Sequence, residues 1–195
     1  MKFDFQESLN SPKHLDPVVE STKEMLAQLQ IVDEPARIMP VIDVPEFGNQ
    51  IEVMQNGIAI IVDQRRFKST ERTPIRSDNA AQCDYAILKT PLSDGKFQYT
   101  LIHVYEGDLE SNAFGYRLDD VAKITNAQST TIHVSSDTHT INSTAIDLKY
   151  KGITSTKHIK VPTKRQYLSI VYRPETNEVL TRIGESETVN VYQGF

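Results

Sequence analysis

Short apolar runs, many of them alternating with polar residues, recur along most of the chain and predict strands rather than helices. The clearest pair is 83–88 and 97–105, which flank the turn residues Ser93-Asp94-Gly95. A second pair, 167–172 and 179–183, flanks the proline-containing turn 173–177. These two pairs predict two β-hairpins.

Further strands are expected from weaker patterns. Asn56-Gly57 separates the apolar runs 51–55 and 58–62 and predicts another hairpin, because both turn positions require positive φ. Pro40 interrupts the run 38–44, so this run should lie at a sheet edge or form a broken strand. The remaining expected strands are 131–134, 144–149 and 153–161, although 135–147 could instead hold a helical turn.

The polar segments and the helical periods complete the expected organisation. Residues 63–80 are polar and contain Pro74, so we expect a long exposed connection. A helix should begin at Asp16-Pro17, with its apolar face between Val18 and Leu29, and end at Pro35. A shorter helix is expected over 116–127.

The expected fold class is therefore α+β. We expect a β-rich α/β/β sandwich with mostly antiparallel strands and two or three helices. Residues 1–14 should be a loose N-terminal segment, followed by a single domain over 15–195.

Composition narrows the functional classes. The net charge is -5 and the basic residues are scattered, apart from Arg65, Arg66 and Lys68, which argues against nucleic-acid binding. No apolar run reaches the roughly 20 residues of a membrane span. The first residues lack the apolar core of a signal peptide, so we expect a cytoplasmic protein or one secreted into a target cell without a cleavable signal.

Cys83 is the only cysteine and is the candidate nucleophile. If the hairpin loop holds an odd number of residues centred near Ser93 or Asp94, Cys83 lies opposite His103 or Tyr105, and Cys83 and His103 share one face of the sheet. A two-residue Asp94-Gly95 turn would instead place His103 on the other face. On a shared face, the imidazole can take the thiol proton and generate a thiolate.

A third group should orient the imidazole. We expect a hydroxyl or carbonyl from the segment before Cys83, and Ser77 is the residue we name. Ala80 and Ala81 have short side chains that would leave the approach to Cys83 open, and backbone N–H groups near them could form an oxyanion hole. No metal or organic cofactor is required.

Two simpler interpretations compete with catalysis and metal binding. A free cysteine usually packs as a small buried hydrophobe, and such a thiol would be alkylated only on unfolding. His133 and His139 are six residues apart, a spacing that suits a metal site poorly, so we interpret them as polar surface residues.

The order of these parts resembles the chemoreceptor glutamine deamidase CheD and the catalytic domains of cytotoxic necrotizing factor-like toxins. The matching stretches are 77–83, then His103, the helix opening at 115–122, and the closing hairpin at 167–180. Ser77 occupies the place of a family threonine, whereas Ala81-Gln82-Cys83 replaces the family's Gly-Ser-Cys or Ser-Gly-Cys. The resemblance implies an α/β/β sandwich and a cysteine hydrolase acting on a glutamine side chain of a partner protein.

The leading hypothesis is therefore a cysteine-dependent protein glutamine deamidase, in which Cys83 attacks, His103 transfers protons and Ser77 orients His103. A cysteine peptidase or acyltransferase would use the same residues on another substrate. The alternative from a different class is a non-catalytic protein-binding module that uses an exposed sheet face. The partner protein and the oligomeric state stay open at this point.

Overall fold

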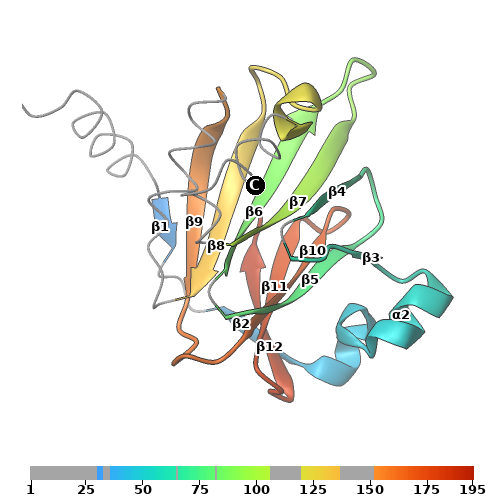
Figure 1. The fold of residues 1–195 in the computed structure, drawn as a ribbon, viewed down its shortest axis with the longest axis vertical. Coiled ribbons are helices and arrows are strands. Elements are labelled where there is room, and N and C mark those ends of the chain that lie inside the picture. The colour runs from blue at the N-terminus through green and yellow to red at the C-terminus, as the bar shows by residue number, and fades with distance from the viewer. Residues whose placement is uncertain (1–29, 33–35, 65, 82, 106–119, 137–151) are drawn as a thin grey trace, which may run out of the picture.

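The computed structural model describes residues 30–32, 36–64, 66–81, 83–105, 120–136 and 152–195, which form two six-stranded sheets packed face to face (Figure 1). The first sheet contains the hairpin that carries Cys83. Its strands, in spatial order, are β1 (Gln30–Val32), β9 (Thr154–Val161), β8 (Thr130–Ser136), β6 (Cys83–Pro91), β7 (Phe97–Tyr105) and β4 (Phe67–Thr70).

The second sheet contains the strands around the closing hairpin. In spatial order they are β2 (Arg37–Pro40), β12 (Thr188–Gln193), β11 (Glu178–Ile183), β10 (Leu168–Arg173), β5 (Ile75–Ala80) and β3 (Ile60–Ile61). The β1–β9, β8–β9 and β3–β5 pairings are parallel, and the other described pairings are antiparallel. The expected β-rich α+β fold with mostly antiparallel strands is confirmed.

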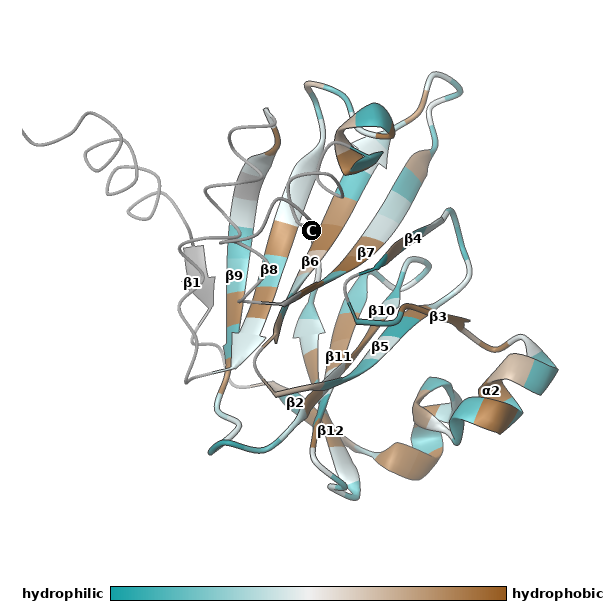
Figure 2. Cartoon of the chain, in the orientation of Figure 1, coloured by the Kyte–Doolittle hydropathy of each residue, from teal (hydrophilic) through white to brown (hydrophobic). Residues whose placement is uncertain are grey.

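Strand alternation divides each sheet into an inner and an outer face. On β6, Tyr85 and Ile87 point inward and pack with Ile170 and Tyr172 of the second sheet in the main core. Ala86 and Leu88 point outward, where they join Val121 and Ile153 in a smaller cluster. Figure 2 shows the apolar bands of this core on β6, β8 and β10.

A helical layer covers the outer face of the second sheet. It consists of η1 (Val41–Asp43), η2 (Pro45–Phe47) and the α-helix α2 (Gln50–Asn56). Phe47 and Val44 of this layer pack with Val171, Leu180 and Val189. Within this layer α2 packs against η2, and Figure 1 shows α2 extending to the side of the two sheets.

The expected hairpin at 51–62 is wrong, because its first half is the helix α2. The Asn49 side chain caps α2 by accepting a hydrogen bond from the Ile51 N–H at 2.8 Å. Gly57 has φ 64 and terminates α2 in the left-handed conformation. Asn-Gly provides positive φ for a helix end as readily as for a hairpin turn, so this dipeptide alone does not distinguish the two.

The expected exposed connection at 63–80 is also wrong, because it contains β4 and β5. Some of its polar residues are paired within the sandwich rather than solvated: the Ser69 and Thr100 hydroxyls lie 2.7 Å apart, and Arg76 forms an ion pair with Asp78. Hydrogen bonding of this kind allows polar side chains to occupy buried strand positions.

The remaining expectations have mixed outcomes. β2 lies at a sheet edge and ends at Pro40, as expected for 38–44. Helical residues 120–123 confirm part of the helix expected over 116–127. The helix expected to end at Pro35 is wrong at its end, because Gln30–Val32 is a strand. Three expectations lie outside the described residues: the earlier part of this helix, the segment 1–14 and the strand at 144–149. β12 was not predicted.

The C-terminal strand is held by close contact between Gly194 and Asn177. A Cβ atom at Gly194 would lie 2.3 Å from Asn177 Oδ1 and 2.8 Å from its carbonyl oxygen. We therefore expect Gly194→Ala to destabilise the protein by about 1 to 3 kcal/mol, because the backbone must shift to relieve the overlap. Urea unfolding would measure this loss of stability, with Gly152→Ala as a control. Gly152 has a φ of 78 and open space around it, so its replacement by alanine reports backbone strain without steric overlap.

Candidate active site

The register of the β6–β7 hairpin places Cys83 and His103 on one face of the first sheet. Cys83 pairs with Tyr105, and Tyr85 pairs with His103, so the hairpin is centred on Asp94 with an odd number of loop residues. The odd-loop alternative is therefore confirmed and the two-residue turn is wrong. Cys83 and His103 are diagonal neighbours, a relation that places their Cβ atoms about 7 Å apart.

That shared face is the inner one, so the second sheet can supply a third group. Ser77 of β5 lies opposite His103 across the sandwich, with its Oγ 2.7 Å from His103 Nδ1. Ser77 is fully buried and His103 is 2% exposed. The structure thus brings Ser77 and His103 into hydrogen-bond contact, and it places Cys83 on the same face as their diagonal neighbour.

The hydrogen bonds of Ser77 determine the tautomer of His103. Ser77 Oγ also lies 2.5 Å from the carbonyl oxygen of Val62, which can only accept. A hydroxyl has one proton, so Ser77 donates to Val62 and accepts from His103 Nδ1–H. His103 Nε2 then carries the lone pair, and it is buried with no hydrogen-bond partner among the described residues.

Burial keeps His103 uncharged. It lowers the pKa of His103 from 6.5 to about 4, and the negative charge of Asp63 opposes this shift only in part. The Tyr85 ring packs against the imidazole with centroids 4.7 Å apart, and the Tyr85 hydroxyl donates to the Leu168 carbonyl at 2.8 Å. At neutral pH, His103 is therefore a neutral imidazole whose Nε2 is unprotonated.

Cys83 is buried at the edge of the same core, with 4% of its surface exposed. Gln64 donates a hydrogen bond from Nε2 to Cys83 Sγ at 3.4 Å. Sequence reasoning missed Gln64, because it lies in the stretch that was expected to be an exposed connection. The approach expected past Ala80 and Ala81 does not leave Cys83 open: Ala81 is exposed, but Ala80 is buried in β5 and Cys83 itself is 4% exposed.

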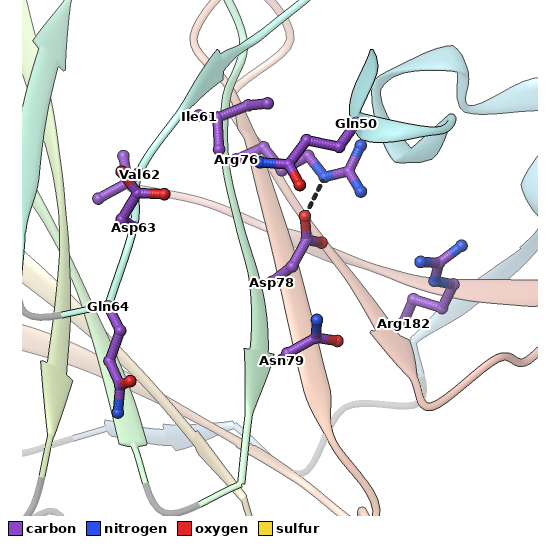
Figure 3. A pocket seen from close by; sticks show the side chains of 9 residues that line it. All are labelled: Gln50, Ile61, Val62, Asp63, Gln64, Arg76, Asp78, Asn79 and Arg182. Atoms are coloured by element: carbon purple, nitrogen blue, oxygen red, sulfur yellow. Dashed lines mark hydrogen bonds and ion pairs between the residues drawn. The ribbon is translucent and has the colours of Figure 1, made fainter. Parts of the chain in front are cut away.

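A cavity of about 310 Å³ lies beside this cluster, between the end of β3 and the end of β5 (Figure 3). The Arg76 guanidinium pairs with Asp78 at 2.7 Å and forms the wall of the cavity near α2. The cavity therefore has a polar lining. The residues that line it are Gln50, Ile61, Val62, Asp63, Gln64, Arg76, Asp78, Asn79 and Arg182.

One histidine outside this cluster differs from the sequence interpretation. His133 is 1% exposed rather than a surface residue, and it pairs in register with His158 on the neighbouring strand. His139 lies outside the described residues. Within the described part of the chain, no group of three or more histidine, cysteine or acidic residues is arranged to hold a metal ion.

Comparison with known proteins leaves the site to be interpreted from its own geometry. No protein-family model matches the chain, and no curated protein matches it. None of the helices in the described ranges is long and apolar enough to cross a membrane.

Proposed function

We propose that the protein is a cysteine hydrolase that deamidates a glutamine side chain of a partner protein. The observation that carries this proposal is the pair of contacts that Ser77 makes with Val62 and His103, from which the tautomer of His103 follows. Ser77 fixes Nδ1–H, which leaves a neutral, unpartnered Nε2 on the face that also holds Cys83. A nucleophile, a base and a group that orients the base form the minimal unit of covalent catalysis.

The reaction proceeds through a thioester. His103 Nε2 takes the proton from Cys83 as Sγ attacks the carboxamide carbon, and the C–N bond breaks while His103 returns the proton to the departing ammonia. Water then attacks the thioester carbon, with His103 again accepting a proton, and releases glutamate and the free thiol. Ser77 holds the ring through Nδ1 in both steps, so that Nε2 faces the reacting atoms.

The choice of glutamine rests on two considerations. The order of the parts resembles the glutamine deamidases of the CheD and cytotoxic necrotizing factor type, and the described site supplies the cysteine and histidine that the resemblance implies. The same resemblance motivates the proposal that the substrate is reached in the cytoplasm or after delivery into another cell. A peptidase or acyltransferase would use the same three residues.

The test is mass spectrometry of glutamine-bearing partner proteins incubated with the native protein or with Cys83→Ser. Conversion of glutamine to glutamate adds about one mass unit to the partner. We expect this conversion with the native protein and not with the variant. Equal conversion by both proteins would exclude Cys83 as the nucleophile.

A non-catalytic binding module is the second candidate, and one observation favours it. Four large apolar residues, at 64–89% exposure, lie in β2 and the helical layer, namely Ile38, Ile42, Ile51 and Met54. Exposed apolar residues that gather in one region often mark a protein-binding surface. This surface is the helical layer and its neighbouring edge strand rather than the exposed sheet face that the sequence suggested.

A further inference from the structure

The cavity between β3 and β5 exists because the two strands separate. They pair only at Ile60 with Ile75 and at Ile61 with Arg76, and Val62 N–H donates a last hydrogen bond to the Arg76 carbonyl at 2.8 Å. Beyond this point the chain leaves β5, and Figure 3 shows Asp63 and Gln64 on one side of the opening, with Asp78 and Asn79 on the other.

The inner end of this opening borders the candidate active site. Val62 lines the cavity and also accepts the hydrogen bond from Ser77. Gln64 lines the cavity and also donates to Cys83 Sγ. Gln64 is exposed, whereas the sulfur it contacts belongs to a residue with 4% exposure. One flexible side chain therefore lies between the cavity and the thiol.

The lining favours an uncharged polar group. The lining holds two cations, Arg76 and Arg182, and two carboxylates, Asp63 and Asp78, so its formal charges cancel. Arg76 is paired with Asp78, and the Arg182 guanidinium lies 5.3 Å from the Phe47 ring centroid. One acceptor, Asp78 Oδ1, and one donor, Arg182 Nε, have no hydrogen-bond partner among the described residues. A carboxamide offers both a donor and an acceptor without net charge, and so suits a polar lining whose formal charges cancel.

We propose that this cavity is the entrance for the substrate carboxamide, and that Gln64 closes its inner end by placing its own carboxamide against Cys83. In the resting protein, Gln64 occupies the position that the substrate group takes during reaction. The substrate side chain displaces Gln64 and thereby reaches Sγ. This inference rests on the proposed function, because it assumes that Cys83 is the group to be reached.

The test compares alkylation of Cys83 by iodoacetamide in the folded native protein, in Gln64→Ala and in Gln50→Ala. Iodoacetamide is a suitable probe because it is small, neutral and itself a carboxamide. Gln50 provides the matched control: it is exposed and lines the same cavity from α2. We expect Gln64→Ala to raise the alkylation rate at least tenfold and Gln50→Ala to leave it within twofold of the native rate.

A native rate in Gln64→Ala, or an equal increase in both variants, would overturn the proposal. Thermal unfolding of the three proteins would show whether a fast alkylation rate reflects a loosened fold. An increase in alkylation rate that disappears when the proteins are compared at equal stability would also contradict the proposal. Protection of Cys83 in Gln64→Ala by N-acetylglutamine amide, but not by N-acetylglutamate amide, is the second expected result.

The failure of this inference and that of the proposed function are distinguishable. If alkylation is unchanged in Gln64→Ala but Cys83→Ser abolishes deamidation, the cavity is not the entrance and Cys83 is still the nucleophile. Deamidation that survives Cys83→Ser removes the proposed function, whatever the alkylation rates are.

Discussion

Replacing His103 with glutamine is expected to lower kcat/KM for deamidation by about 10³-fold, within the range of a general acid–base group. Glutamine keeps a polar side chain at this buried position, but it has no titratable lone pair to accept the thiol proton. Cys83→Ser should lose at least as much, because a hydroxyl is a far weaker acid than a thiol and His103 deprotonates it much less readily. The measurement is the rate of glutamate formation by mass spectrometry.

The double variant distinguishes a catalytic pair from two independent residues. If Cys83 and His103 act as one unit, Cys83→Ser combined with His103→Gln should be no slower than the worse single variant. Multiplied losses would contradict a shared step. Ser77→Ala is the third member of the series: it removes the acceptor for Nδ1–H, so we expect a smaller loss, about 10-fold to 100-fold.

Lowering the pH should destabilise the fold, because its buried histidines resist protonation in the folded state. Burial lowers the pKa of His103 to about 4 and that of His158 to about 4; burial and the neighbouring His158 lower the pKa of His133 to about 3. Their unfolded pKa values are about 6.5. Between pH 6.5 and pH 4 the unfolded chain therefore binds more protons than the folded one, and the free energy of unfolding falls as the pH falls.

His103→Gln removes the contribution of His103 to this pH dependence of the free energy of unfolding. Lowering the pH from 7 to 4 should cost the native protein on the order of 2 to 3 kcal/mol more than the variant, because a shift of one pKa unit corresponds to about 1.4 kcal/mol. Urea unfolding at several pH values provides the measurement. The carboxylates titrate in both proteins and cancel in the comparison, so parallel pH profiles would show that His103 is not held neutral by the fold.

The candidate site was predictable where it depends on local sequence periodicity. The alternation within 83–88 and 97–105 predicts the hairpin, and the odd loop centred on Asp94 is one of the three registers that the sequence leaves open. Ser77 was named as an orienting group, and the structure gives it the contact to His103 that this role requires. Its catalytic role, like those of Cys83 and His103, stays a prediction.

The missed parts depend on contacts between distant segments. The hydrogen bond from Ser77 to Val62, which determines the His103 tautomer, joins two residues that sequence patterns assigned to a strand and to a loop. Arg76 looked solvated, yet it is 4% exposed because Asp78 and the carbonyls of Glu46 and Gly48 satisfy it. Hydropathy along the chain does not reveal such partners, so buried polar strands were taken for exposed connections.

The two sheets share the site unequally: the first sheet supplies Cys83 and His103, and the second supplies Ser77. Neither sheet contains a complete set of the three groups. During refolding, strand pairing within each sheet would therefore precede any competence for chemistry, which would appear only when the sheets dock. Recovery of activity would thus report the docking of the two sheets against each other.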